Sequence, residues 1–159
     1  MKAGKLLCLF FLPFLFGGEK KMVTFQVWPV GYVVKKGGQT KIQILEEYRP
    51  ALLGLDGFSH IHVLWWFHRN DIPPKRRILQ VHPRGNPHNP LTGVFATRSP
   101  VRPNLIALTT CKIKRVAEDG VEVEWIDAFD GTPVLDIKPY IPGLDRVVRP
   151  KVPDWIKRR

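Results

Sequence analysis

The chain has 159 residues and a formal net charge of +11, which is enough for one domain with a real core and too little for two comfortable ones. So large a positive surplus favours an anionic partner, nucleic acid first and an anionic membrane surface second, with a merely soluble basic protein as the alternative. Only two cysteines are present, Cys8 and Cys111, which excludes a disulfide framework or a Cys-rich zinc site and fits a reducing cytoplasm.

The first residues allow two interpretations. A basic start precedes the apolar run 6–16, as in a signal peptide. The run is too short to span a bilayer as a helix, contains Pro13, and lacks the small residues expected at a cleavage site. Met22 then leads directly into a strand pattern. We therefore interpret residues 1–21 as an apolar extension from a miscalled or non-functional start, with a working signal as the alternative.

The following segment has mainly the pattern of strands. Beta-branched and aromatic residues dominate 25–34, and polar and apolar residues alternate over 40–45. Residues 46–53 are compatible with a short helix interrupted by Pro50. Residues 59–67 form the strongest predicted strand, which alternates at first and then becomes apolar on both faces. Such a run is typical of a central strand covered on both sides.

The second half of the chain predicts more short strands. The expected strands are 78–81, 105–116, 121–126 and 134–137. Polar or irregular loops are expected at 70–77 and 82–92. Many short strands with little helix predict an all-β fold, a small barrel or sandwich, over 22–145. The tail 146–159 is basic and contains prolines at intervals, and no secondary structure is predicted for it. The chain has no glycine-rich loop of the dinucleotide or P-loop type, which argues against a Rossmann methyltransferase or an ATPase.

A proline-stiffened loop is the first candidate functional segment. Residues 93–104 read G-V-F-A-T-R-S-P-V-R-P-N and separate two apolar runs. Proline restricts its own backbone and that of the preceding residue, so the loop presents Arg98, Ser99, Arg102 and Asn104 rigidly. The planar fork of arginine suits a carboxylate or phosphate.

A second segment of the same character, 130–140, reads D-G-T-P-V-L-D-I-K-P-Y. Its charged residues Asp130, Asp136 and Lys138 form either a reactive group or a structural ion-pair cluster. Tyr140, held between prolines, can stack on a base or an adenine ring.

Histidines and basic residues supply further candidates. His60 and His62 share one face of a strand, but no carboxylate or cysteine lies at a convincing spacing, so we expect hydrogen-bonded structural histidines and no metal site. His68 ends the strong strand beside Arg69, where barrel sites often lie. The basic run 75–77 adds to a field that attracts RNA phosphates, with a solvated loop as the alternative.

These segments resemble the TrmO family, also called TsaA-like or YaeB-like, from about Pro29 to Asp145. The two proline-stiffened segments are the most specific part of the match. The others are W-P-V-G-Y-V-V at Trp28, L-D-G-F-S-H-I at Leu55 and W-F-H-R at Trp66. The family also carries a proline-arginine-glutamine segment after its first strand, where this chain has only K-K-G-G-Q at 35–39.

The resemblance implies a small β-barrel methyltransferase that uses S-adenosylmethionine, acts as a homodimer, and methylates the N6 nitrogen of threonylcarbamoyladenosine beside the anticodon of certain tRNAs. The positions that match the family's cofactor pocket are His68, Arg69, Arg98, Leu108, Gly131, Thr132, Pro133 and Val134. We expect a cytoplasmic protein without stable membrane association.

The chemistry of this transfer suggests further roles. The urea-like N6 nitrogen is a poor nucleophile while it keeps its proton, so Asp136 is the candidate base, with Lys138 or Arg98 stabilising charge on the ureido oxygen. The predicted catalytic set is Asp136, Lys138 and Tyr140, all from the second segment. The predicted RNA contacts are Arg102, Asn104, Lys75, Arg76 and Arg77. The alternatives are a non-catalytic RNA-binding barrel, a methyltransferase of the same fold with another substrate, and a secreted enzyme or binding protein.

Overall fold

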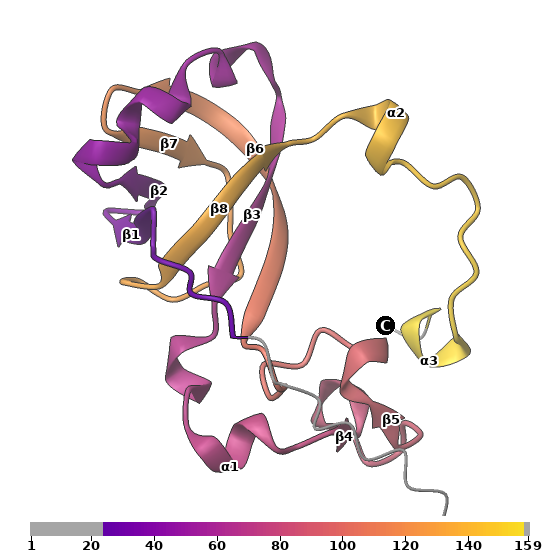
Figure 1. The fold of residues 1–159 in the computed structure, drawn as a ribbon. Coiled ribbons are helices and arrows are strands. Elements are labelled where there is room, and N and C mark those ends of the chain that lie inside the picture. Colours follow the sequence, from indigo (N-terminus) through magenta and orange to yellow (C-terminus); the bar gives the residue numbers. More distant parts are fainter. Residues whose placement is uncertain (1–23, 158–159) are drawn as a thin grey trace, which may run out of the picture.

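The computed structural model describes residues 24–157, so the predicted extension 1–21 lies outside the described residues. The strands of the main sheet are β1 (Gly31–Lys36), β2 (Gln39–Ile44), β3 (His60–Trp66), β6 (Ile106–Ala117), β7 (Gly120–Val123) and β8 (Pro133–Pro139). They close into an antiparallel barrel in the order β1-β2-β7-β6-β3-β8 (Figure 1). The predicted small all-β barrel is confirmed.

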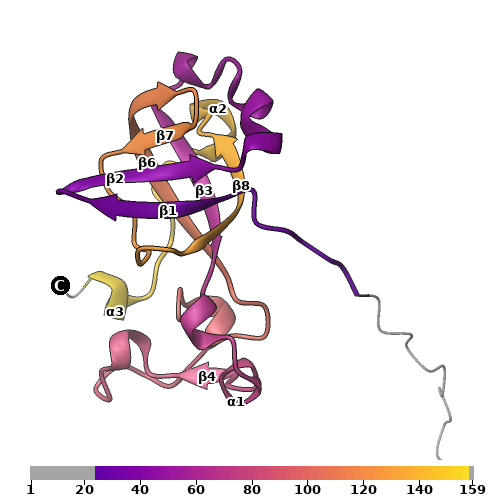
Figure 2. The same cartoon turned by 90° about the vertical axis from the view of Figure 1, so that its left-hand side faces the viewer.

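A smaller lobe lies at one end of the barrel, built by the chain between β3 and β6 (Figure 2). Its elements are η3 (His68–Asn70), α1 (Pro73–Arg76), β4 (Gln80–Val81), η4 (Pro83–Gly85), β5 (Thr92–Gly93) and η5 (Val94–Ala96). The polar loop expected at 70–77 therefore contains a one-turn helix. Proline is favourable in a first helical turn, where its missing N–H has no partner to lose, and this explains the helix start at Pro73.

The remaining helices lie outside the barrel wall, two beyond its far end and two after β8. At the end away from the lobe, the short helix expected over 46–53 is present as the 3₁₀-helix η1 (Glu46–Leu52), and a second 3₁₀-helix, η2 (Leu55–Gly57), follows it. After β8 the chain forms α2 (Pro142–Asp145), passes down one side of the molecule, and ends in α3 (Asp154–Lys157) beside the lobe (Figure 1). The tail thus returns towards the segment that carries Arg98.

Several strand predictions were wrong in part, two of them in the first half of the chain. The strand expected over 25–34 begins only at Gly31, because Pro29 has no N–H to donate to a ladder and the side chain of Trp28 is left 64% exposed. The strand at 59–67 is not covered on both sides, since a barrel strand has one inner and one outer face. Trp65 is buried, whereas Trp66 is half-exposed and its Nε1 donates to Asp71 Oδ2 at 2.9 Å.

The inner face of the barrel forms the hydrophobic core. Alternate residues of β3 (Ile61, Val63 and Trp65) point inward, as the period of two requires. The indole Nε1 of Trp65 donates to Thr109 Oγ1 at 3.0 Å, so this buried polar group is satisfied. Burial raises the pKa of the Cys111 thiol to about 12, which keeps it protonated and unreactive at neutral pH.

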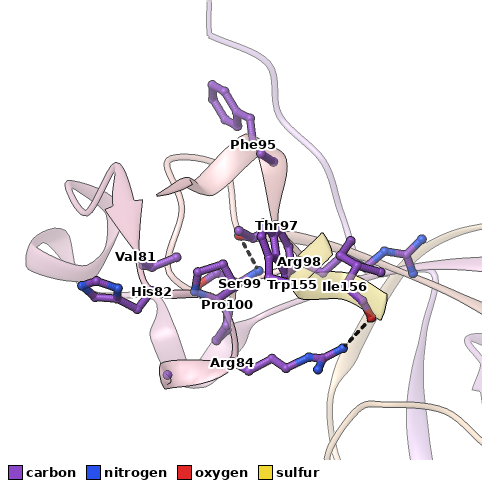
Figure 3. Close-up of a pocket in the computed structure, with 13 residues that line it drawn as sticks. Val81, His82, Arg84, Phe95, Thr97, Arg98, Ser99, Pro100, Trp155 and Ile156 are labelled. Atoms are coloured by element: carbon purple, nitrogen blue, oxygen red, sulfur yellow. Dashed lines mark hydrogen bonds between the residues drawn. The ribbon is translucent and has the colours of Figure 1, made fainter. Parts of the chain in front are cut away.

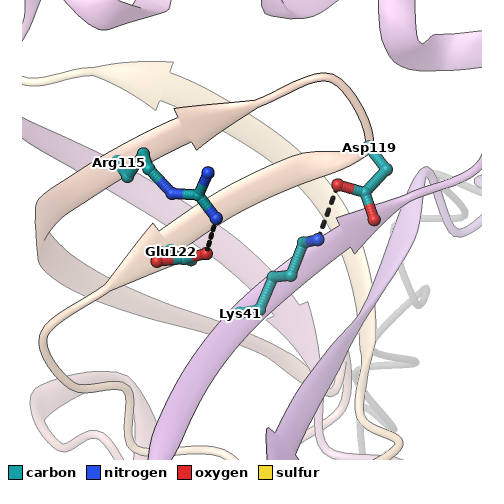
Figure 4. A network of polar contacts seen from close by, with 4 residues as sticks. All are labelled: Lys41, Arg115, Asp119 and Glu122. Atoms are coloured by element: carbon teal, nitrogen blue, oxygen red, sulfur yellow. Dashed lines mark hydrogen bonds and ion pairs between the residues drawn. The ribbon is translucent and has the colours of Figure 1, made fainter.

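Two ion pairs support the outer surface where β2, β7 and β6 run side by side (Figure 4). Lys41 Nζ donates to Asp119 Oδ1 at 2.6 Å, and the guanidinium of Arg115 contacts Glu122. The hydrogen bond from Lys41 lowers the pKa of Asp119, and that from Arg115 lowers the pKa of Glu122. The first pair links β2 to the turn between β6 and β7, and the second links β6 to β7, so both favour the observed register.

We expect Lys41→Gln to lower the contribution that ionised Asp119 makes to the free energy of unfolding. The pKa of Asp119 is depressed in the folded chain, so its contribution is fully present above the ordinary value of 3.8 and is lost as the pH falls through the lowered value. The loss at pH 7 is small, because the pair is solvent-exposed. Urea unfolding at pH 7 and at about pH 2 measures the difference. Lys36→Gln is the control, and equal pH dependence in Lys41→Gln and the parent chain would contradict the prediction.

Candidate functional site

A cavity of about 500 Å³ lies where β3 leaves the barrel and enters the lobe. Four separate parts of the sequence build its wall: the end of β3, the loop of Arg98, the loop between β7 and β8, and the β1 residue Lys35. The lining residues are Lys35, Trp65, Phe67, His68, Arg69, Asn70, Arg98, Pro100, Trp125, Ile126, Asp127, Ala128, Phe129 and Thr132. The cavity therefore unites the two proline-stiffened segments through Arg98 and Thr132.

The turn after β3 brings two of the predicted cofactor residues to the cavity. The N–H of Phe67 donates to the Leu105 carbonyl at 2.8 Å, so the chain stays tied to the start of β6. The next residues turn into η3, which carries His68 and Arg69. The rings of Trp65 and Phe67 meet edge to face with their centroids 4.7 Å apart, and this pair gives the cavity an aromatic wall.

The loop of Arg98 is held by more than its prolines. Thr97 Oγ1 donates to the Val94 carbonyl at 2.9 Å and accepts from the Ser99 N–H at 3.2 Å. Arg98 Nη1 donates to the Leu108 carbonyl at 3.4 Å. Leu108 thus contributes its backbone, while its side chain is 44% exposed on the outer surface of β6. These contacts fix Arg98 at the cavity.

Thr132 has an unusual environment. Its side chain is fully buried, and its Oγ1 has no hydrogen-bond partner among residues 24–157. A buried hydroxyl without a partner is costly, and this one belongs to a residue of the cavity wall. The preceding Gly131 has φ of 74°, which lets the chain turn tightly before β8. A ligand with a polar group near Thr132 would satisfy the hydroxyl.

Three cations, Lys35, Arg69 and Arg98, line the cavity together with one carboxylate, Asp127. The Arg69 guanidinium lies 3.9 Å from the centroid of the Phe129 ring, a cation–π contact. Lys35 donates from Nζ to the Ile126 carbonyl at 3.1 Å and from its backbone N–H to Asp130 Oδ1 at 2.7 Å, which holds the loop 126–130 in place. With Arg98, these cations suit an anionic group, while the aromatic side chains suit a flat ring.

Sequence reasoning missed the first part of the loop between β7 and β8, residues 124–129. The expected strand 121–126 ends at Val123, and the residues that follow turn towards the cavity. Trp125 is 60% exposed and Phe129 is 55% exposed. Two aromatic residues so close together in W-I-D-A-F-D were the signal, because exposed large apolar side chains frequently mark a binding surface.

Three other predicted cofactor positions do not line the cavity with their side chains but shape the backbone or the core next to it. Gly131 makes the turn described above, Pro133 begins β8, and the side chain of Val134 is fully buried in the barrel core. Val134 also accepts a hydrogen bond from the Val30 N–H at 2.8 Å. These positions therefore shape the wall, while Thr132 lines it.

The predicted catalytic residues lie elsewhere on the same chain. Asp136 lines a separate cavity of about 310 Å³ with Tyr48 and Phe58. Its Oδ2 lies 2.8 Å from Lys138 Nζ, and this hydrogen bond raises the pKa of the lysine. The Tyr140 N–H donates to the His60 carbonyl. At about 3.3 Å per residue, His60 is about 20 Å along β3 from its end beside the first cavity. Asp136 is nearer, because it pairs with Leu64, next to Trp65 of the cavity wall, but its side chain lines the other cavity.

The basic residues of the lobe have structural contacts. Arg76 Nη2 pairs with Asp71 Oδ1 at 2.8 Å, and its Nη1 donates to the Pro103 carbonyl at 3.1 Å, so it ties α1 to the loop of the two arginines. Lys75 Nζ donates to Asn70 Oδ1 at 2.9 Å. The three remaining predicted RNA contacts, Arg77, Arg102 and Asn104, lie outside the residues that line the cavity.

The two strand histidines have hydrogen-bonding partners. His60 Nδ1 lies 2.9 Å from Ser59 Oγ, and His62 Nδ1 lies 2.9 Å from Thr110 Oγ1. His62 Nε2 also lies 3.4 Å from Asp145 Oδ1. Over the described range 24–157, no group of three or more His, Cys, Asp or Glu side chains is placed to hold a metal ion. Over the same range, no helix has the length and apolar character needed to cross a membrane.

The fold and cavity define a small antiparallel β-barrel with a largely cationic, aromatic-walled cavity at the end of one strand. The model of the tRNA-methyltransferase O N-terminal domain family matches residues 24–146, and the chain belongs to this family. The resemblance found in the sequence is thereby confirmed.

Several relatives are similar to this chain. A protein of Pyrococcus horikoshii, named as a probable S-adenosyl-L-methionine-binding protein, is 50% identical over 118 residues, or 74% of this chain and 84% of that protein. The tRNA (adenine(37)-N6)-methyltransferase of Mus musculus is 47% identical over 95 residues, or 60% of this chain but 21% of the mouse protein. The crystal structure of TrmO from Pseudomonas aeruginosa superposes with a TM-score of 0.62 at 29% identity, covering 81% of this chain and 62% of that one.

Proposed function

We propose that the protein is an S-adenosylmethionine-dependent tRNA adenine-N6 methyltransferase, and that its acceptor is N6-threonylcarbamoyladenosine next to the anticodon. The observation that carries this proposal is the cavity in which His68, Arg69, Arg98 and Thr132 meet. The family resemblance placed these four at the cofactor pocket, and they come from three separate segments. A cytoplasmic location follows from a tRNA acceptor.

The residues of the cavity fit the cofactor. The unsatisfied Thr132 hydroxyl needs a polar partner, the aromatic wall suits an adenine ring, and Arg98 with Lys35 suits a carboxylate. Lys35 belongs to the stretch that replaces the family's proline-arginine-glutamine segment, so this stretch still contributes to the wall. When bound, S-adenosylmethionine supplies a methyl group activated by its sulfonium. The protein's part is to bind, orient and exclude water, which accounts for most of the rate in such transfers.

We also propose that two copies assemble, with the catalytic set of one copy beside the cavity of the other. The support is the separation within one chain, where Tyr140 bonds to the far end of β3 and Asp136 lines a different cavity. A base must come within hydrogen-bonding reach of the proton that it accepts. An assembly of two chains supplies this reach without unfolding the barrel.

The test of the function combines two measurements on the full chain. Calorimetry with S-adenosylmethionine is expected to show binding, and mass spectrometry of nucleosides is expected to show methylated threonylcarbamoyladenosine after incubation with tRNA that carries the unmethylated form. Cofactor binding without tRNA modification would instead indicate a same-fold methyltransferase with another substrate. The absence of cofactor binding would indicate a non-catalytic RNA-binding barrel.

Asp136→Asn is expected to lower kcat by about 100-fold or more, because a positioned general base contributes about 10²–10⁴ to the rate. Cofactor affinity is expected to stay unchanged, since Asp136 does not line the cofactor cavity. Single-turnover methylation at pH 7 measures the effect. Full activity of the variant would remove Asp136 from the role of base.

A mixing experiment tests whether two copies build the site, independently of whether Asp136 is the base. Chains with Asp136→Asn and chains with Arg98→Ala each lack one half of a shared site. If two copies build the site, the mixed sample regains activity that neither variant has alone. Activity that stays at the level of the separate variants would place both residues in one chain's site and overturn the shared arrangement.

A further inference from the structure

A groove of about 1040 Å³ lies beside the cofactor cavity, between the lobe and α3 (Figure 3). It shares the wall residues Arg98 and Pro100 with that cavity, so the two spaces lie on either side of this loop. One wall is formed by the segment 81–85 and by 95–100. The opposite wall is formed by Trp155 and Ile156 of α3.

The α3 wall is held in place by the lobe. Arg84 has φ of 61° and follows the buried Pro83, so its side chain projects from a fixed turn. Its Nη2 donates to the Ile156 carbonyl at 3.4 Å, which Figure 3 shows as the contact between η4 and α3. The family match ends at residue 146, so this wall comes from a part of the chain that the family model does not cover.

The chemistry of the groove matches single-stranded nucleic acid. Such ligands are bound by aromatic side chains that stack on bases and by cations that follow the phosphates. The groove offers the half-buried indole of Trp155 opposite the hydroxyls of Thr97 and Ser99 and the guanidinium of Arg98. The chain that leads to it adds Arg149 and Lys151, in a protein whose net charge is +11.

We propose that this groove binds the single-stranded RNA that flanks the acceptor adenosine, with the indole of Trp155 stacked on a base. The identity of the acceptor rests on the proposed function, whereas the RNA site rests on the groove. Because Arg98 lines both spaces, a strand bound in the groove lies next to the proposed cofactor cavity. The C-terminal segment is then a substrate-binding wall.

The test compares three substitutions at Trp155 in the full chain. Fluorescence anisotropy with a labelled, unmodified anticodon-loop oligonucleotide, without cofactor, gives the dissociation constant. Trp155→Ala is expected to weaken binding about tenfold, because stacking on one base contributes about 1–3 kcal/mol. Trp155→Phe keeps a stacking ring and is expected to stay within about threefold of the parent chain. Trp155→Leu fills the space without a ring, so it is expected to behave like alanine.

Controls separate stacking from damage to the fold. Leu53→Ala removes an apolar side chain that is 95% exposed at the far end of the barrel, and it is expected to leave RNA affinity unchanged. Calorimetry with S-adenosylmethionine is expected to give the same affinity for the Trp155 variants and the parent. In steady state, the KM for tRNA is expected to rise while kcat changes little.

Two results would overturn the proposal. One is RNA affinity in Trp155→Ala equal to that of the parent chain. The other is parental affinity in Trp155→Leu, which would mean that the side chain only packs. Because the RNA measurement needs no methyl transfer, it remains readable if the chain fails to bind S-adenosylmethionine, a failure that would count against the proposed function alone.

Discussion

Arg98→Ala is expected to weaken S-adenosylmethionine binding by about 10- to 100-fold, more than any other single change in the cavity. A hydrogen bond to a charged group contributes about 1.5–3 kcal/mol, and arginine can make two such bonds to a carboxylate. Arg98 is fixed for this role by its bond to the Leu108 carbonyl. Calorimetric titration of the full chain with the cofactor measures the loss.

A neighbouring arginine provides the matched control. Arg102 lies in the same stiffened loop but outside the residues that line the cavity, so Arg102→Ala is expected to keep the parental affinity for the cofactor. Arg98→Lys keeps the positive charge but loses the planar guanidinium. Its affinity for the cofactor is therefore expected to lie between those of Arg98→Ala and Arg102→Ala. Unchanged cofactor affinity in Arg98→Ala would show that the cavity does not bind its ligand through this guanidinium.

Gly120→Ala is expected to destabilise the barrel by about 3–5 kcal/mol, since overpacking and backbone strain act together. A Cβ at this position would lie 2.1 Å from the backbone oxygen of Ile42, and φ is 153°. Gly120 pairs with Gln43 in the β2–β7 ladder. Neither strand can move away without breaking that ladder. Urea unfolding followed by circular dichroism measures the free energy of unfolding.

A second glycine distinguishes this effect from the general cost of changing a glycine. Gly57 has open space around the position of a Cβ and does not have a positive φ. Gly57→Ala is therefore expected to change the stability by less than about 0.5 kcal/mol. If the two variants unfold at similar urea concentrations, the close approach of β2 and β7 at Gly120 does not limit the barrel.

Local patterns predicted most of the strands. Alternation over 40–45 and the apolar run 59–67 correspond to β2 and β3, because a strand with one buried face needs a period of two. The pattern failed at Trp66, which is apolar but lies on the outer face, where its Nε1 donates to Asp71. Hydrophobicity alone does not tell which face of a strand is covered.

The candidate site was predictable only in part. The motifs around Arg98 and Thr132 pointed to a pocket, and the structure places both residues on one cavity wall. Phe129 and Lys35 were missed as wall residues, because each reaches the cavity through contacts with residues distant in sequence, such as Asp130 with Lys35. Closeness in sequence does not place a residue in the same cavity either, since Asp136 is close to Thr132 in sequence but lines a different cavity.

By itself, the sequence determined the all-β class, the positive charge and the two rigid segments, because strand period, charge and proline geometry are local properties. Only the tertiary structure decided that the barrel closes through β1 and β8 and that Arg98 and Thr132 share a cavity. It also decided that α3 returns to set Trp155 across the groove from the Arg98 loop. The physical reason is that cavities form between segments far apart in the chain, and their positions depend on the packing of the whole barrel.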